Sequence, residues 1–307
     1  MFTIIICSYN GARTIHDAIR SVLQQDEYDS LVEQFIVVDN ASIDSTKDIV
    51  NGFSDERITY AYQPLAGLGN ARLKGVELAT ADWIVFVDDD NELDPNWIKT
   101  AAEFIESHPS VGIFGGSVVP KLEFEATAEE YEHLKRHRGM LACTDLSRDQ
   151  IDFSRTRSPL YCTVGAGMVV KTVYLKELAD RGWIKQMGRT KDNLASGDDT
   201  EIGVYIIQRR KQEEGHCPRM ILEHNLSRNR LQSDYLLKLH RPLITASYNY
   251  QTRRKWYWLR RMKRIVYYLT KKNPYKDGTL EYQMWKQEKK LYLSYCLKDV
   301  LFLKKVK

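Results

Sequence analysis

Short apolar runs alternate with helical periodicities through most of the chain. Residues 2–7 form a β-branched run that stops at Ser8, and apolar positions recur at helical spacing over residues 14–24. A buried strand followed by an amphipathic helix is the repeating unit of a parallel sheet with helices on both faces. The pattern therefore predicts an α/β fold with a mainly parallel central sheet.

The remaining predicted elements follow the same two periodicities. Further strands are expected at 35–38, 58–62, 83–87, 111–119, 161–170 and 219–223, and further helices around 70–79, 171–181 and 197–211. The charged stretch 121–157 is expected to be helical in its first half. Nearly everything from residue 235 onward has helical spacing, so the chain is predicted to divide into a domain of residues 1–234 and a helical extension of residues 235–307.

Charge indicates the same division. Residues 235–307 hold 19 Lys and Arg against 4 Asp and Glu, whereas residues 1–234 hold 26 against 37. Such an acidic body is not typical of a nucleic-acid-binding protein, while the basic extension favours anionic neighbours. We expect no nucleic-acid partner.

Composition also bears on the cellular setting. No apolar run approaches the roughly 18 residues that a membrane span requires, and the first apolar run is too short for a signal-peptide core. The five cysteines are odd in number, scattered and never spaced as C-x-x-C, which argues against a disulfide framework and a structural zinc site. These features favour a reducing, cytoplasmic location.

Polar clusters follow three of the predicted strands: Ser8-Tyr9-Asn10, Asp39-Asn40-Ala41-Ser42 and Asp88-Asp89-Asp90. In an open α/β sheet, ligands bind beyond the carboxyl ends of the strands, so these clusters are expected to meet at one edge. Three successive aspartates are costly unless a cation neutralises them, and Mg²⁺ or Mn²⁺ is held by one or two carboxylates with substrate phosphates. This favours a metal–diphosphate site, with a solvated acidic turn as the alternative.

Four segments, taken in order and spacing, resemble the successive motifs of family 2 glycosyltransferases, which have the nucleotide-diphospho-sugar transferase (GT-A) fold. The segments are IIICSYNGARTIHDAIRSVL, FIVVDNASIDST, GLGNARLKGVELATADWIVFVDDDNELDPNW and SGDDTEI. Each motif is weak alone, but four in register are a strong signal. The resemblance covers about residues 1–230.

The resemblance implies a role for each matching residue. The nucleotide of the donor would be held by Ser8, Tyr9, Asn10 and Asp39. Arg72 would position either the diphosphate or the aspartate loop, Asp88 and Asp89 would contact the ribose, and Gly167 would let the sugar approach the backbone. Asp90 would bind the metal as the last member of a D-x-D motif. The alternatives are a turn or cap role for Asp39 and a tightly packed strand at Gly167.

Three further residues complete the implied site. Asp199, the second acid of Gly197-Asp198-Asp199, matches the usual catalytic base, although acids beside a helix N-terminus also act as caps. His224 would be a further metal ligand and Arg230 a further diphosphate contact, because imidazole suits Mn²⁺ and guanidinium pairs with phosphate. Without the resemblance, His224 would be interpreted as an ordinary surface or core histidine.

Together these inferences predict a metal-dependent, inverting glycosyltransferase. It would use Mn²⁺ or Mg²⁺ to move a sugar from a UDP-sugar to a saccharide or lipid-linked acceptor in surface polysaccharide biosynthesis. A sugar nucleotidyltransferase is the alternative enzyme class, but the loop CSYNGAR lacks its basic, glycine-rich character. A non-catalytic nucleotide-sugar or glycan-binding module is the other alternative.

The basic, aromatic-rich segment 253–272 is a separate candidate for function. Its Lys and Arg side chains alternate with Trp and Tyr, a composition that suits peripheral attachment to the anionic inner face of the cell membrane. An anionic acceptor polymer is a second candidate partner. Helical packing onto the transferase domain, or onto a second copy in a homo-oligomer, is the structural alternative.

Overall fold

The computed structural model describes residues 1–143, 163–182, 197–252, 263 and 266–305. Their strands form one sheet in the order β3-β2-β1-β4-β7-β6-β8-β5. The strands are β1 (Phe2–Ser8), β2 (Val32–Asp39), β3 (Ile58–Tyr62), β4 (Trp83–Asp88), β5 (Asn91–Leu93), β6 (Val111–Lys121), β7 (Met168–Lys171) and β8 (Glu213–Asn225).

Within the described residues, four of the seven strand pairings are parallel. These are β1 with β2, β1 with β4, β2 with β3, and β6 with β8, while β7 and β5 pair antiparallel with their neighbours. The predicted α/β fold with a mainly parallel sheet is therefore confirmed. The antiparallel β7 inserts between β4 and β6 and joins the two parallel halves.

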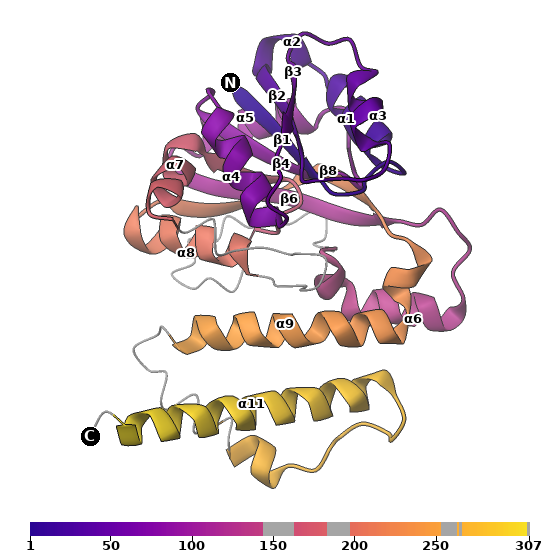
Figure 1. The fold of residues 1–307 in the computed structure, drawn as a ribbon, viewed down its shortest axis with the longest axis vertical. Helices are drawn as coiled ribbons and strands as arrows, with labels where there is room; N and C mark the ends of the chain where they lie inside the picture. The colour runs from indigo at the N-terminus through magenta and orange to yellow at the C-terminus, as the bar shows by residue number, and fades with distance from the viewer. Residues whose placement is uncertain (144–162, 183–196, 253–262, 264–265, 306–307) are drawn as a thin grey trace.

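Helices cover both faces of this sheet (Figure 1). The α-helices are α1 (Ile15–Leu23), α2 (Tyr28–Leu31), α3 (Thr46–Asn51), α4 (Leu68–Leu78), α5 (Trp97–Ser107), α6 (Ala128–His137), α7 (Thr172–Asp180), α8 (Asp198–Arg209), α9 (Ser233–Thr252) and α11 (Leu280–Lys305). Successive residues of a strand point to opposite faces. Accordingly, Ile4 belongs to the core cluster that includes residues of α1 and α5, whereas its neighbour Ile5 belongs to the cluster that includes residues of α4, α7 and α8.

The C-terminal helices lie beside the sheet domain, with α9 between the sheet domain and α11 (Figure 1). A separate apolar cluster joins them to α6 and to the 3-10 helix η1 (Arg138–Leu141), through Leu134, Leu141, Leu236, Leu280 and Met284. Residues 128–143 therefore pack with the C-terminal extension, although they precede residue 234 in the sequence.

The predicted attachment to a membrane rests on segment 253–272, which lies partly outside the described residues. Most of the basic segment 253–272 is not described, since only residues 263 and 266–272 of it are. Among the residues that are described, no helix is both long enough and apolar enough to cross a bilayer.

Strands β7 and β8 differ most from the predicted boundaries, and one strand was not predicted. The predicted strand 161–170 becomes the shorter β7, preceded by a turn at residues 165–167, and residues 161 and 162 are not described. Strand β8 starts six residues earlier than the predicted 219–223. The three-residue β5 escaped prediction because Asn91-Glu92-Leu93 has no strand pattern of its own and is held by pairing with β8.

Gly116 allows the closest approach of β6 to β8. A Cβ atom at this position would collide with the backbone carbonyl of Met220, at the point where the β6–β8 register shifts. We predict that Gly116→Ala destabilises the protein by about 2 kcal/mol or more, because the neighbouring backbone cannot yield cheaply. Denaturant unfolding measures this change.

Gly139 provides the matched control. It is exposed, has no positive φ, and a Cβ there would meet nothing within 4 Å. Gly139→Ala should change the free energy of unfolding by no more than about 0.5 kcal/mol. Equal stability of the two variants would contradict this description of the β6–β8 contact.

Candidate functional site

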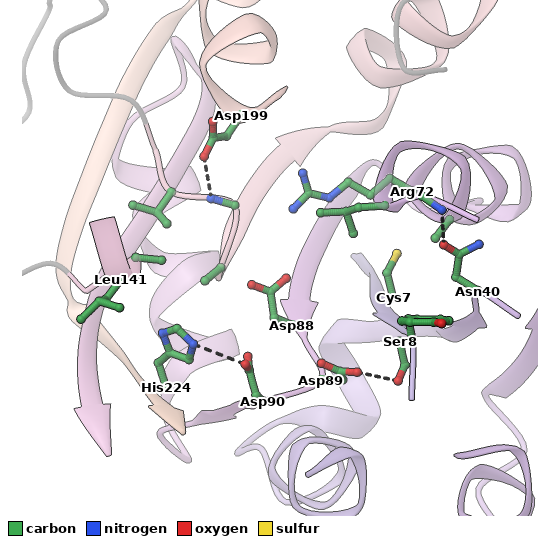
Figure 2. Close-up of a pocket in the computed structure, with 18 of the residues that line it drawn as sticks. Cys7, Ser8, Asn40, Arg72, Asp88, Asp89, Asp90, Leu141, Asp199 and His224 are labelled. Atoms are coloured by element: carbon green, nitrogen blue, oxygen red, sulfur yellow. Dashed lines mark hydrogen bonds and ion pairs between the residues drawn. The ribbon is translucent and has the colours of Figure 1, made fainter. Parts of the chain in front are cut away.

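A cavity of about 630 Å³ opens at the carboxyl ends of β1 and β4 (Figure 2). Nine of the twelve residues predicted for the site line it: Ser8, Tyr9, Arg72, Asp88, Asp89, Asp90, Asp199, His224 and Arg230. Parallel pairing explains this convergence, because Cys7 of β1 lies opposite Asp88 of β4 in the sheet register. The loops that follow these two strands therefore leave the sheet at the same edge.

In the turn after β4, which holds Asp88, Asp89 and Asp90, the surroundings shift the pKa values of Asp89 and Asp90 in opposite directions. The Ser8 hydroxyl donates to Oδ2 of Asp89 at 2.5 Å. Burial, and then the neighbouring Asp90 charge, raises the pKa of Asp89 to about 7. Asp89 therefore takes up a proton more readily than an ordinary carboxyl group, and protonation reduces the repulsion between it and Asp90.

Asp90 remains ionised because a cation adjoins it. Arg230 donates through one terminal nitrogen to Oδ2 of Asp90 at 2.7 Å and through the other to Nε2 of His224 at 2.8 Å. Burial opposes ionisation of Asp90, but the charge of Arg230 outweighs it and holds the pKa of Asp90 below its usual range. The result is a half-buried carboxylate and guanidinium in contact with the buried imidazole of His224.

The short strand β5 brings this trio together. Asn91 of β5 lies opposite His224 of β8 in an antiparallel register, so the preceding Asp90 ends beside the His224 ring. The 3-10 helix η3 (Arg228–Leu231) then turns Arg230 back toward both groups. Leu231, fully buried in the C-terminal helical cluster, fixes the end of this turn.

The Asp90–His224 pair offers donor atoms of the right kind for a divalent cation. Nε2 of His224 accepts a hydrogen bond from Arg230, so it carries a lone pair, and it lies 3.4 Å from Oδ2 of Asp90. No cluster of three or more His, Cys, Asp or Glu side chains suited to a metal occurs among the described residues. Two protein ligands completed by substrate phosphates and water nevertheless fit how Mg²⁺ and Mn²⁺ are commonly bound in substrate complexes.

Asp199 lies on a different side of the cavity from the aspartate turn (Figure 2). It is the second residue of α8, where Oδ1 accepts from the Thr200 amide at 2.7 Å and Oδ2 accepts from the Gly165 amide at 3.3 Å. A carboxylate near a helix N-terminus is also favoured by the helix dipole. The side chain is thus held by hydrogen bonds while still lining the cavity.

Arg72 brings a second guanidinium to the cavity wall. It is buried on α4, stacks 5.1 Å from the ring centroid of Phe86, and lines the cavity. A Cβ atom on Gly165 would lie 2.7 Å from a terminal nitrogen of Arg72. The small residue at 165 therefore admits the guanidinium rather than a larger side chain.

Three predicted binding residues lie outside the cavity lining: Asn10, Asp39 and Gly167. The carboxylate of Asp39 is only 2% exposed, and its two oxygens accept from the Tyr60 hydroxyl at 2.7 Å and the Ser42 amide at 2.8 Å. The predicted contact between Asp39 and a nucleotide base stays a prediction. Asp39 fixes the loop that follows β2.

In this structure Asn10 connects two loops, and Gly167 belongs to a tightly packed turn. Asn10 joins two loops, since its amide donates to the Ser42 hydroxyl and its side-chain oxygen accepts from the Ile43 amide, both at 2.9 Å. Gly167 has φ of +70°, and a Cβ there would lie 2.5 Å from the Leu222 side chain. It belongs to the packed turn before β7, so its neighbours Gly165 and Ala166 line the cavity in its place.

Several residues of the lining were not among the predicted site residues, and they include two groups. Cys7 and Asn40 adjoin predicted residues, and this adjacency was the available signal. Burial raises the pKa of the Cys7 thiol to about 12, so it stays protonated. The second group, Met140–Ala142 with Tyr235 and Leu239 of α9, forms a more apolar wall and carries no motif. Its position follows from the packing of η1 against the C-terminal helices.

Comparison with curated proteins finds glycosyltransferases. The chain is 25% identical over 239 residues to the glucosyl-dolichyl phosphate glucuronosyltransferase of Haloferax volcanii, covering 76% of this chain and 72% of that protein. It is 28% identical over 138 residues to the poly(ribitol-phosphate) beta-N-acetylglucosaminyltransferase TarS of Staphylococcus aureus. That match covers 42% of this chain and only 24% of TarS.

Solved structures show the same fold. Residues 1–349 of S. aureus TarS in complex with UDP superpose with a TM-score of 0.53 at 15% identity, covering 88% of this chain and 75% of that one. The complex with UDP-GlcNAc gives a TM-score of 0.54 at 14% identity, covering 94% and 79%. The GT-A fold expected from the sequence motifs is thereby confirmed.

The sequence profile described as glycosyl transferase family 2 matches residues 3–165, which is just over half of the chain. This match includes the ends of β1, β2 and β4 and the aspartate turn that lines the cavity. The protein therefore belongs to glycosyl transferase family 2.

Proposed function

We propose that this glycosyltransferase is metal-dependent and inverting, and that it moves a sugar from a UDP-sugar to a saccharide or lipid-linked acceptor in surface polysaccharide biosynthesis. The observation that carries the proposal is the convergence of the aspartate turn, two arginines and Asp199 on one cavity. Relatives named for transfer to a dolichyl phosphate glycan and to poly(ribitol-phosphate) support the acceptor class. The TarS complexes with UDP and UDP-GlcNAc support the donor class.

In the proposed mechanism, the donor diphosphate lies near Arg72 and Arg230, whose charges compensate its own. Tyr9, 40% exposed at the cavity mouth, stacks on the base, and Asp88 and Asp89 contact the ribose. These contacts orient the donor with its sugar toward Asp199. Fixed orientation of this kind supplies much of the rate acceleration in two-substrate reactions.

The chemical step is a single displacement. The acceptor hydroxyl oxygen bonds to the anomeric carbon as the bond from that carbon to the diphosphate oxygen breaks, and the electron pair leaves with UDP. Asp199 takes the proton from the attacking hydroxyl as general base. Its hydrogen bonds to the amides of Gly165 and Thr200 hold the carboxylate in place at the cavity wall.

Asp90 and His224 are the proposed ligands of Mn²⁺ or Mg²⁺. When bound, the cation would neutralise charge that develops on the departing diphosphate. Binding requires Arg230 to release these two side chains, and the donor phosphates are a suitable new partner for its guanidinium. The donor and the metal are therefore expected to bind cooperatively.

We further propose that the segment after α9 attaches the enzyme to an anionic membrane surface. In its described part, Val266, Tyr267, Leu269 and Tyr275 are between 42% and 66% exposed. Lysines 263, 271, 272 and 276 accompany them in the sequence. Exposed apolar and aromatic side chains beside basic ones suit a lipid headgroup region.

Replacement of Asp199 by Asn tests the proposed base. The amide preserves the size of the side chain but cannot accept a proton, so we expect Asp199→Asn to lower kcat by at least about 100-fold. UDP binding, measured by calorimetry, should be retained. Asp180→Asn on the exposed end of α7 is the matched control and should transfer sugar normally. Near-normal turnover by Asp199→Asn would refute the assignment.

Chelation tests the proposed metal. Transfer should cease in EDTA and return with Mn²⁺ or Mg²⁺. Asp90→Asn should raise the Mn²⁺ concentration for half-maximal activity by about tenfold or more, because one of two protein ligands is lost. Exposed Asp26→Asn serves as control and should leave the metal requirement unchanged. Full activity in EDTA would exclude metal dependence.

Vesicle flotation tests the membrane surface. The protein should float with vesicles that contain anionic lipid and remain unbound to neutral ones. Lys271→Glu with Lys272→Glu should weaken this binding by at least about tenfold, since each basic residue near an anionic surface contributes about 1 kcal/mol. The control pair Lys135→Glu and Lys176→Glu makes the same charge change on α6 and α7. Equal loss in both pairs would attribute binding to net charge and contradict the proposal.

A further inference from the structure

A buried carboxyl group lies outside the cavity, behind the residues that hold Asp199. Glu214 is the second residue of β8, is 4% exposed, and lies beside β6 in the sheet. Its Oε1 accepts from the Thr163 amide at 2.6 Å and from the Thr163 hydroxyl at 3.1 Å. Its Oε2 is buried without a hydrogen-bond partner among the described residues.

Burial of the Glu214 carboxyl group lowers the stability of the folded protein. Burial raises the pKa of Glu214 to about 7, so the neutral acid is available at physiological pH. A buried polar atom without a partner costs about 1–3 kcal/mol, and an apolar side chain of similar size would avoid that cost. A carboxyl at this position therefore calls for an explanation other than stability.

Thr163 begins the short segment that donates a hydrogen bond to Asp199, and this position offers an explanation for Glu214. Two residues further along, the Gly165 amide donates to Oδ2 of Asp199. Glu214 therefore anchors one end of a three-residue segment whose other end binds the proposed base. The Thr163 side chain also packs tightly on β6, because a Cβ on Gly115 would lie 2.7 Å from its methyl group.

Glu214 also faces the helix that carries Asp199. A Cβ on Gly203 of α8 would lie 4.0 Å from Oε1 of Glu214. One carboxyl oxygen thus lies between the segment that donates to Asp199 and the helix from which Asp199 projects. Loss of this acceptor would leave the Thr163 amide buried without a partner and free the segment to move.

We propose that Glu214 is a positioning residue that fixes the direction of the Asp199 carboxylate through Thr163 and Gly165. The inference rests on the proposed role of Asp199 as general base. Glu214 does not contact either substrate in this scheme. Its hydrogen-bond acceptor, rather than a negative charge, is the property that matters.

Two substitutions separate the acceptor from the charge. Glu214→Gln keeps an oxygen for Thr163 and should retain kcat within about threefold. Glu214→Leu removes the acceptor at similar volume and should lower kcat by about 10- to 100-fold, because small displacements of a catalytic group have effects of this size. The donor KM should stay within about twofold in both variants, since the donor contacts are unchanged.

A stability control and a weaker variant complete the kinetic test. Val22→Ala truncates a buried residue of α1 on the opposite face of the sheet and should lower the Tm while leaving kcat unchanged. If Glu214→Leu does not fold, Thr163→Val decides instead, with an expected three- to tenfold loss of kcat at constant KM. Unchanged kcat in the folded variant, or an equal loss in Glu214→Gln and Glu214→Leu, would overturn the inference.

Hydrogen exchange gives a readout that does not require transfer. Mass spectrometry should show faster exchange at the Gly165 amide in Glu214→Leu, and native protection in Glu214→Gln and Val22→Ala. Should the unsubstituted protein transfer no sugar, the proposed function fails, and this measurement still decides the structural link. Native protection of Gly165 in Glu214→Leu would overturn it.

Discussion

Crowded negative charge at the carboxyl end of β4 is the constraint on which the rest of the site depends. Three consecutive aspartates follow one another there, and the fold compensates the charges of Asp89 and Asp90 in different ways. Arg230 pairs with Asp90, while Asp89 takes a hydrogen bond from Ser8 and is readily protonated. In the proposed mechanism, a donor diphosphate and its cation would replace both the proton on Asp89 and the guanidinium beside Asp90.

The fold places these aspartates in the lining of the cavity, and distant elements form its other walls. Parallel pairing of β1 and β4 sets the floor of the cavity, and the pairing of β5 with β8 brings His224 to Asp90. The opposite boundary comes from α8, which carries Asp199, and from α9 and η1, which are held by the C-terminal apolar cluster. The extension is thus part of the site as well as an addition to the domain.

Sequence patterns anticipated the elements that have strong periodicity, and motifs anticipated most of the charged residues that line the cavity. The run at residues 58–62 matches β3, and the aspartates after β4 line the cavity as expected. Asp39 shows the limit of such reasoning. Its place at the end of β2 was predicted correctly. The Tyr60 hydroxyl that donates to its carboxylate comes from the neighbouring strand β3, and no local sequence pattern reports that contact. Contacts between distant residues likewise determine β5 and the apolar wall from η1 and α9, so local patterns did not predict them. Glu214 is a further case, because its partner Thr163 lies 51 residues away in the sequence.

A crystal structure of the protein with UDP and Mn²⁺ tests the central claim most directly. The predicted result places the cation on Asp90 and His224 and the diphosphate between Arg72 and Arg230. Asp199 should face the space where the donor sugar would lie. Nucleotide bound at another surface, or bound in this cavity with the Asp90–Arg230–His224 contacts unbroken and no cation present, would contradict it.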